Sequence, residues 1–153
     1  MRVHRICRAP FRALDGEGAR LYGGRWNSAG RPVVYASSAL SLAALEYLVH
    51  LDPADAPDDL VALTIDVPDD APSEGVNAAD LPAGWAQSPE AAACRAIGDR
   101  WAADGRTLVL RVPSAPVPEE WNVLLNPRHP EMSRVRVVAE RAFGFDPRLV
   151  AGA

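Results

Sequence analysis

The chain has 153 residues, of which 48% are hydrophobic and 24% are charged, and its formal net charge is −4. This length and composition are typical of one globular domain that buries a hydrophobic core, so we expect a single domain over residues 1–153. The acidic balance argues against a protein that binds nucleic acid directly.

Cys7 and Cys94 are the two cysteines. Their spacing fits neither a metal site nor a redox pair, and we expect both to be small buried residues. No apolar run reaches ~20 residues, the length that a membrane span requires. Residues 1–8 carry charge with no apolar segment behind it, so they do not resemble a signal peptide. We therefore expect a cytoplasmic protein without membrane contact.

The first elements follow from local patterns. Apolar and polar residues alternate over 2–7 and predict a strand. Residues 9–24 hold four glycines and predict a mobile loop. β-branched residues predict a short strand over 31–36.

A helix is predicted next, over 39–51, with Ser37 or Ser38 as its N-cap. Residues 60–67 form the strongest strand pattern of the chain. Residues 68–87 are rich in Pro, Asp, Ala and Gly and predict a surface connection.

Ser88-Pro89-Glu90 is typical of a helix start, with a capping serine, a proline at the first position and an acid in the first turn. We expect this helix to run to about Ala103, with Gly105 at its C-terminal cap. Its buried face is predicted to hold Cys94, Ile97 and Trp101.

Strand patterns return in the last third, at 107–112, in 121–130 where a strand runs into a turn, at 134–139 and at 143–149. About six strands and two main helices, without regular alternation of strand and helix, favour an α+β domain with a mixed β core and flanking helices.

Glu46 lies in the predicted helix with apolar neighbours at helical spacing. Leu42 and Val49 share its side of the helix, so the carboxylate would lie on the flank of a buried face. An unpaired carboxylate there costs free energy, and an arginine is the best candidate for its partner. The alternative is a glutamate whose carboxylate reaches water.

Arg25 follows the pair Gly23-Gly24. Glycine has no side chain and permits positive φ, so a ligand or a strand can approach closely. An arginine beside such a pair can clamp a phosphate with its planar guanidinium. The alternative is a hairpin turn with an exposed arginine.

Other polar residues stand at strand ends. Tyr35 ends a short predicted strand, where it can stack on a planar ring or belong to the core. Ser114 follows another strand between prolines and either presents its hydroxyl from a rigid turn or is only a turn residue. Asn122, Asn126 and His129 form a candidate polar cluster, although Asn126-Pro127 is also a turn signal.

The three histidines, His4, His50 and His129, lack the i, i+4 spacing of metal ligands, and we expect no metal site. The chain also lacks the glycine-rich motifs of phosphate loops, dinucleotide-binding folds and serine hydrolases. The block from the glycine pair to the helix indicates instead a site for an anionic, ribose-bearing ligand.

Three segments resemble the RES domain, a family named for an arginine, a glutamate and a serine. They are Gly18-Ala-Arg-Leu-Tyr-Gly-Gly-Arg-Trp-Asn27, Val34-Tyr-Ala-Ser37 and Ala44-Leu-Glu-Tyr-Leu-Val-His50. The named residues would be Arg25, Glu46 and Ser114. Residues 121–130 are similar to the family's C-terminal part, so the resemblance covers nearly the whole chain.

The resemblance implies an ADP-ribosyltransferase-like fold and the toxin of a bacterial type II toxin–antitoxin pair. The implied partner is an antitoxin with an Xre-like helix-turn-helix. The implied substrate is NAD+, from which nicotinamide is released by hydrolysis or phosphorolysis. Some members pass ADP-ribose to a protein.

The residues fit this chemistry. Breaking the nicotinamide–ribose bond builds positive charge on the ribose, and Glu46 is our candidate for the carboxylate that stabilises it. Arg25 would hold the pyrophosphate or the adjoining ribose, and Tyr35 would stack on nicotinamide or support its ribose. Ser114 would bind the substrate or orient the glutamate. Further substrate-binding candidates are Arg5, Gly24 and Asn27. Nicotinamide is an adequate leaving group, so no metal is required.

The same residues leave an alternative open, an ADP-ribosyltransferase that modifies a cellular protein. The acidic charge and the lack of paired histidines count against an RNA-cleaving toxin, and a non-enzymatic interaction module is the remaining hypothesis. The first two functions require one geometry. Arg25 and Glu46 must face one cleft, with Tyr35 and Ser114 on its walls.

Overall fold

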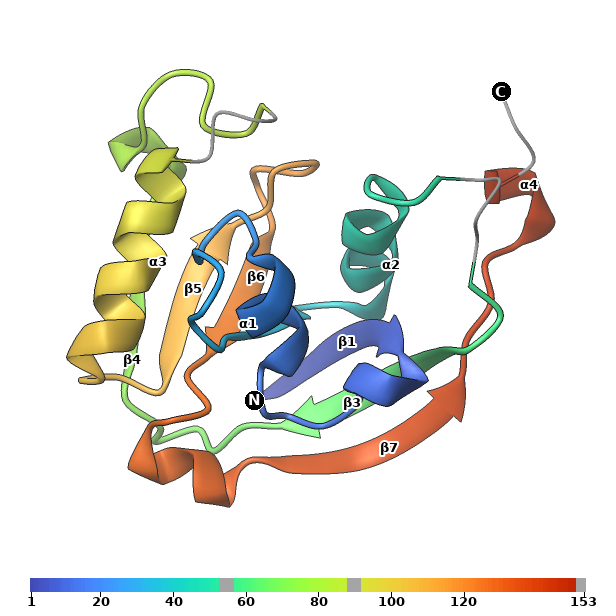
Figure 1. Cartoon of the computed structure of the whole chain (residues 1–153), viewed down its shortest axis with the longest axis horizontal. Coiled ribbons are helices and arrows are strands. Elements are labelled where there is room, and N and C mark those ends of the chain that lie inside the picture. The colour runs from blue at the N-terminus through green and yellow to red at the C-terminus, as the bar shows by residue number, and fades with distance from the viewer. Residues whose placement is uncertain (53–56, 88–91, 151–153) are drawn as a thin grey trace.

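The computed structural model describes residues 1–52, 57–87 and 92–150, and its centre is a mixed β-sheet (Figure 1). The sheet has seven strands in the order β4-β5-β6-β2-β1-β3-β7. Their bounds are β1 Arg2–Arg8, β2 Val34–Ser37, β3 Leu60–Asp66, β4 Ser73–Gly75, β5 Val109–Pro113, β6 Trp121–Leu125 and β7 Arg136–Ala142. Neighbouring strands are antiparallel, except for the parallel pair of β4 and β5.

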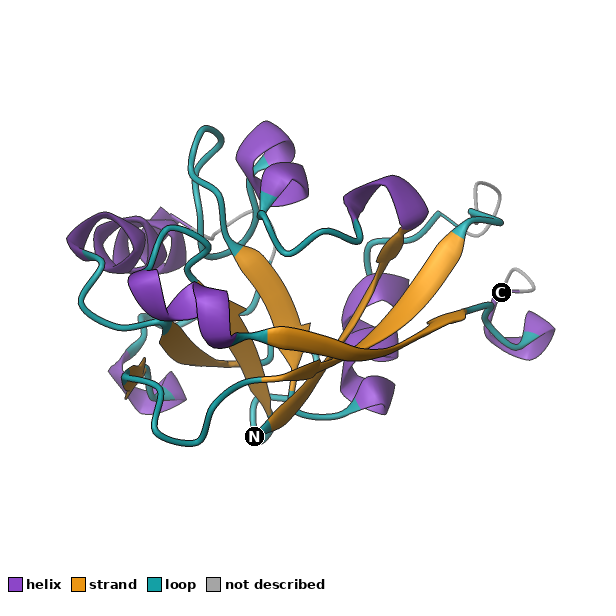
Figure 2. Cartoon of the chain, turned by 90° about the horizontal axis from the view of Figure 1, so that it is seen from below, coloured by secondary structure: helices purple, strands orange, loops and turns teal. Residues whose placement is uncertain are grey.

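The described residues also form four α-helices and several short 3-10 helices. The α-helices are α1 Glu17–Tyr22, α2 Leu40–Leu48, α3 Ala92–Asp104 and α4 Pro147–Val150. In Figure 1, α3 flanks β4 and β5, whereas α2 lies over β1 on the other side of the molecule. Figure 2 shows the strands running through the middle with helices around them. The single α+β domain predicted from the sequence is confirmed.

The sheet is least continuous where β1 meets β2. Within the described part of the chain, His4 and Ser37 are the only residues paired between these strands. In contrast, β1 pairs with β3 along all of Arg2–Arg8. The side chain of Arg5 enters the opening, where its Nη1 donates a hydrogen bond to the Tyr35 carbonyl at 2.9 Å. Arg5 therefore bridges β1 and β2 where their backbones are not paired.

Successive side chains of β2 lie on opposite faces of the sheet. Val34 and Ala36 belong to the largest cluster of buried residues, which also draws on β1, β3, β5 and β6. Tyr35 packs instead against a second cluster that contains Trp26. Because side chains alternate along a strand, Ser37 lies on the same face as Tyr35.

The structure corrects the prediction in the connections. Residues 9–24, predicted as a mobile loop, contain the 3-10 helix Ala9–Phe11 and α1. Helix α1 has six residues, too few for a hydrophobic period to show. The predicted surface connection 68–87 contains β4 and buries Leu81 and Trp85.

Two further predictions were wrong, one about the start of a helix and one about a strand. The N-cap of α2 is Ala39, without a side-chain hydrogen bond, because Ser37 still belongs to β2. The segment 143–149 is not a strand. The rings of Phe143 and Phe145 pack edge to face, with their centroids 5.1 Å apart, and α4 follows them. The two phenylalanines therefore form an aromatic cluster and not one face of a strand.

Helix α3 agrees with the prediction at its end. The Gly105 N–H donates to the Trp101 carbonyl at 3.1 Å, and its φ of 59° is the left-handed conformation that glycine supplies at a helix end. The predicted start at Ser88 lies outside the described residues. Cys94 and Cys7 are buried free thiols, as predicted.

No helix among the described residues is long and apolar enough to cross a membrane. No group of three or more His, Cys, Asp or Glu side chains among them is arranged to hold a metal ion.

Candidate active site

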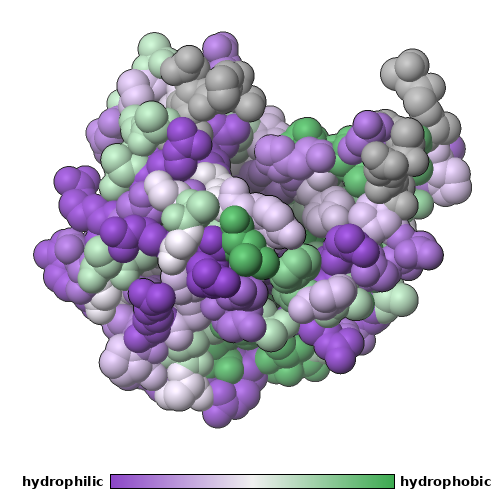
Figure 3. Space-filling view, in the orientation of Figure 1, coloured by the Kyte–Doolittle hydropathy of each residue, from purple (hydrophilic) through white to green (hydrophobic). Residues whose placement is uncertain are grey.

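A cleft of about 560 Å³ opens between α1, α2 and the diverging strands β1 and β2. Its floor is formed by β1 and β2, one wall by residues 22–26 and the opposite wall by α2. The surface in Figure 3 is hollowed between the α3 side and the α2 side of the molecule. Candidate residues that line the cleft are Arg5, Gly24, Arg25, Tyr35 and Glu46. The predicted convergence of Arg25 and Glu46 on one cleft is therefore observed.

Glu46 reaches the cleft from α2 and is half-buried. Its Oε1 accepts a hydrogen bond from Asn122 Nδ2 on β6. Asn122 Oδ1 in turn accepts a hydrogen bond from Ser37 Oγ at 2.6 Å. The prediction that an arginine would pair with Glu46 was wrong. Its partner is the side-chain amide of Asn122 on β6.

Two guanidinium groups line the cleft without a carboxylate partner. Arg25 Nη1 donates to the Trp85 carbonyl at 2.8 Å. Arg5 donates to the Tyr35 carbonyl, and its Nε is buried without a partner among the described groups. Neither arginine forms an ion pair within residues 1–52, 57–87 and 92–150. A guanidinium with free donors suits an anionic ligand such as a diphosphate.

The glycine pair before Arg25 is required by the protein's own packing. Gly23 has φ of 71° and caps the C-terminus of α1. A Cβ on Gly24 would lie 2.7 Å from the Tyr35 hydroxyl. The sequence predicted close approach by a ligand or a strand at the glycine pair, and the structure shows close approach by the Tyr35 side chain of β2.

Tyr35 lines the cleft with its ring, while its hydroxyl is engaged in the loop. Its Oη donates to Asn27 Oδ1 at 2.7 Å and accepts from the Trp26 N–H at 3.0 Å. Burial of the ring raises the pKa of the Tyr35 phenol, so the group stays neutral. These bonds hold Trp26 and Asn27, the two residues that directly follow Arg25.

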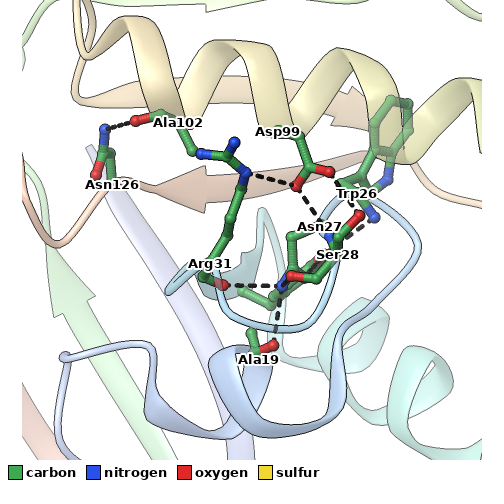
Figure 4. A network of polar contacts seen from close by, with 9 residues as sticks. Ala19, Trp26, Asn27, Ser28, Arg31, Asp99, Ala102 and Asn126 are labelled. Atoms are coloured by element: carbon green, nitrogen blue, oxygen red, sulfur yellow. Dashed lines mark hydrogen bonds and ion pairs between the residues drawn. The ribbon is translucent and has the colours of Figure 1, made fainter.

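Asn27 is fully buried and does not line the cleft. Its Nδ2 donates to the backbone carbonyls of Ala19, Ser28 and Arg31 at 2.9, 3.1 and 2.9 Å (Figure 4). Asn27 therefore ties the loop 23–31 together and to α1, and it has no contact in the cleft.

Helix α3 holds the same loop from outside. Asp99 accepts hydrogen bonds from the Ser28 N–H and Oγ, at 2.9 and 2.6 Å, and its carboxylate lies 3.5 Å from Arg31 Nε (Figure 4). At the preceding position of the helix, a Cβ on Gly98 would lie 1.8 Å from the Trp26 carbonyl oxygen, so helix and loop are in direct contact.

Ser114 does not stand on the cleft wall. It is fully buried, and its Oγ accepts a hydrogen bond from the Val117 N–H at 3.1 Å. Its neighbours Pro113 and Ala115 line the cleft instead. The expected geometry is thus met by Arg25, Tyr35 and Glu46 but not by the serine.

Asn122 lines the cleft, although sequence reasoning did not assign it to the site. Its signal was a lone amide inside the apolar strand Trp121–Leu125, where a polar side chain needs a partner. The proposed cluster with Asn126 and His129 is not formed. Asn126 bonds the Ala102 carbonyl and the Arg128 N–H, and His129 caps a 3-10 helix.

Known proteins resemble this chain along nearly its whole length. A protein named "Toxin Res" from Pseudomonas putida is 43% identical over 141 residues, which cover 89% of this chain and 92% of that protein. A "Prs ADP-ribosylating toxin" from Sphingobium sp. is 40% identical over 139 residues, covering 90% and 86%.

The fold has a solved counterpart. The crystal structure of the M. tuberculosis MbcT–MbcA toxin–antitoxin complex contains a chain that superposes with a TM-score of 0.76 at 21% identity, over 98% of this chain and 86% of that one. At this identity the likeness is one of fold. The RES domain family model matches residues 2–146. The chain therefore belongs to the RES domain family.

Proposed function

We propose that this protein is the toxin of a bacterial toxin–antitoxin pair and that it breaks the nicotinamide–ribose bond of NAD+. The observation that carries the proposal is the convergence in one cleft of the Glu46 carboxylate with the guanidiniums of Arg5 and Arg25, which form no ion pair with any residue that the structure describes. Relatives named as toxins at 37–43% identity support the toxin part. NAD+ consumption would place the protein's action in the cytoplasm, where this substrate is abundant.

Glu46 acts on the ribose. As the C1′–N bond breaks, its electron pair goes to nicotinamide, which leaves as a neutral molecule, and positive charge develops on the ribose. A carboxylate aimed at that ring stabilises the charge. An acceptor hydroxyl then bonds to C1′ and loses its proton to solvent. The chemistry requires no metal ion.

The remaining candidate residues would bind the substrate or support the segments that carry the binding residues. Arg25 and Arg5 would hold the diphosphate from two sides of the cleft, and the Tyr35 ring would support nicotinamide or its ribose. Gly24 and Asn27 would contribute through the loop that carries Arg25. Ser114 would contribute through the turn that leads into β6, whose start bears Asn122.

The test is nicotinamide release from NAD+ by purified protein, measured by chromatography. Glu46→Gln keeps the shape of the side chain and removes its charge, so we expect a loss of about a hundredfold or more in kcat. Glu119→Gln is the matched control, because this exposed glutamate does not line the cleft. Equal rates for both variants would contradict the role of Glu46, and an inert parent protein would contradict the function.

An ADP-ribosyltransferase is the second candidate, and the name of the Sphingobium relative favours it. The same bond would break, with a protein side chain as acceptor in place of water or phosphate. Mass spectrometry of lysate proteins incubated with NAD+ would find an ADP-ribose adduct. Free ADP-ribose, or ADP-ribose 1″-phosphate when phosphate is present, with no adduct would reject this version.

We further propose that an antitoxin with an Xre-like helix-turn-helix binds this chain. The MbcT–MbcA complex supports a toxin–antitoxin arrangement for the fold. Co-purification with the product of a neighbouring gene, and loss of nicotinamide release in that complex, would support it. A neighbour that neither binds nor protects cells would reject it.

A further inference from the structure

We propose that Asn122 and Ser37 are positioning residues, which hold the Glu46 carboxylate in its reactive orientation. The proposal rests on the proposed function for what Glu46 does, and on the hydrogen bonds of the structure for how it is held. The three side chains come from α2, β6 and β2 and form one connected chain of hydrogen bonds.

The support for Glu46 lies in the middle of the sheet. Ser37 and Asn122 are directly paired across β2 and β6, and their exposures are 3% and 9%. Strand β6 is itself held between β5 and β2. A hydrogen bond from this position ties the helix that carries Glu46 to the centre of the sheet.

The orientation of the amide follows from the donors and acceptors. An ionised carboxylate only accepts hydrogen bonds, so the NH2 group of Asn122 must face Glu46. The amide oxygen then faces Ser37, whose hydroxyl must donate to it. Ser37 thereby excludes the flipped amide, which would point its oxygen at the carboxylate.

One oxygen of the carboxylate remains for the substrate. Asn122 engages Oε1, and among the described residues Oε2 has no hydrogen-bond partner. A glutamate without this tether has three rotatable bonds and samples several rotamers. A displacement of about 1 Å at a reacting group can cost about a hundredfold in rate. The hydrogen bond from Asn122 to Oε1 should therefore raise kcat more than it changes the binding of the substrate.

Asn122→Asp is the most informative variant, because it keeps the shape of the side chain and replaces the donor with an acid. At neutral pH two ionised carboxylates would face each other, and because like charges repel, the pair would take up one proton as the pH falls. With that proton on the introduced aspartate the donor is restored. We expect kcat to fall about tenfold or more at pH 7.5 and to recover toward lower pH, with the optimum moved down by about one pH unit or more.

Two other variants complete the series. Asn122→Ala removes the donor at every pH, so we expect kcat to fall about tenfold to a hundredfold with a change in KM below about threefold. Ser37→Ala frees the amide to flip and should lower kcat less. Asn126→Ala is the control, since this buried asparagine of the same region bonds Ala102 and does not reach Glu46.

A second measurement does not depend on NAD+. Crystal structures should show the Glu46 side chain in another rotamer, or in several, in Asn122→Asp and Asn122→Ala, and in the parent's rotamer in Asn126→Ala. A displaced Glu46 side chain in an NAD+-inert protein would support the tether and reject only the proposed function. The proposal is overturned if Glu46 keeps one rotamer in all four proteins, or if the pH profile of Asn122→Asp superimposes on that of the parent.

Discussion

Gly24, directly before Arg25, packs closely against the side chains that hold the loop. An added Cβ would lie 2.7 Å from the Tyr35 hydroxyl and 3.0 Å from Asn27 Oδ1, and both groups belong to the bonds that fix the loop. We expect Gly24→Ala to destabilise the protein by about 1–3 kcal/mol, as overpacking does elsewhere. Chemical denaturation monitored by tryptophan fluorescence gives the free energy of unfolding.

Gly144→Ala is the control for this substitution. No atom lies within 4 Å of a Cβ at that position, and its φ is not positive. The control should stay within about 0.5 kcal/mol of the parent protein. A Gly24→Ala variant as stable as the control would mean that the loop yields more easily than the contacts indicate.

The sequence predicts single residues well where the signal is local. Arg25 beside a glycine pair and Glu46 on the flank of an apolar helix face can both be identified from their neighbours. The partner of Glu46 cannot, because Asn122 lies 76 positions away in the chain. Pairing across a sheet depends on strand order, which local patterns do not contain.

At the scale of elements, α3 acts as a brace for the loop 23–31. Asp99 accepts two hydrogen bonds from Ser28 and faces Arg31, and its side chain is only 20% exposed. We expect Asp99→Ala to destabilise the protein by about 1–3 kcal/mol, because two hydrogen bonds to a charged group are lost. The displaced loop carries Arg25, so KM for NAD+ should also rise.

Asp104→Ala tests whether any aspartate of α3 has this effect. Its carboxylate lies 3.6 Å from Arg106, and both side chains are well exposed, so the pair contributes little. Thermal unfolding and steady-state kinetics of the two variants should differ clearly. Equal behaviour would show that Asp99 does not brace the loop.

Elements were predictable in proportion to their length and regularity. Strand β3 and the end of α3 follow from strong apolar patterns and from Gly105. The six residues of α1 and the three of β4 are too short to show a period. Ser37 was misassigned as a helix cap because serine suits both a cap and, as here, a buried hydrogen bond within a strand.

At the scale of the whole molecule, several exposed ion pairs connect distant segments. Asp70 binds Arg134 at 2.6 Å across 64 positions, joining the segment after β3 to the 3-10 helix before β7. Hydrogen bonds and charges of arginine partners lower the pKa values of four carboxyl groups that are exposed or half-buried. These groups are Glu17, Asp59, Asp70 and Asp146.

These shifts fix the sign of the protein's pH dependence. A carboxyl whose pKa is lower in the folded state contributes stability above its unfolded pKa, and this stability is lost as pH falls through the folded pKa. We therefore expect Tm to fall as the pH drops below about 4, the region where unfolded Asp and Glu take up protons. Because the pairs are exposed, 1 M NaCl should reduce the difference in Tm between pH 7 and pH 3.

Asp70→Asn tests the contribution of one pair. The amide carries no charge to pair with Arg134, so the variant should be less stable than the parent at pH 7. Because the amide does not take up a proton as the pH falls, the Tm of the variant should depend less on pH. Asp66→Asn is the matched control, an exposed aspartate at the end of β3 that forms no ion pair among the described residues. If both variants follow the parent curve between pH 7 and pH 3, the Asp70–Arg134 pair does not contribute to acid unfolding. A flatter curve of Tm against pH for Asp70→Asn alone would assign part of the acid sensitivity to the ion pair that connects the segment after β3 with the 3-10 helix before β7.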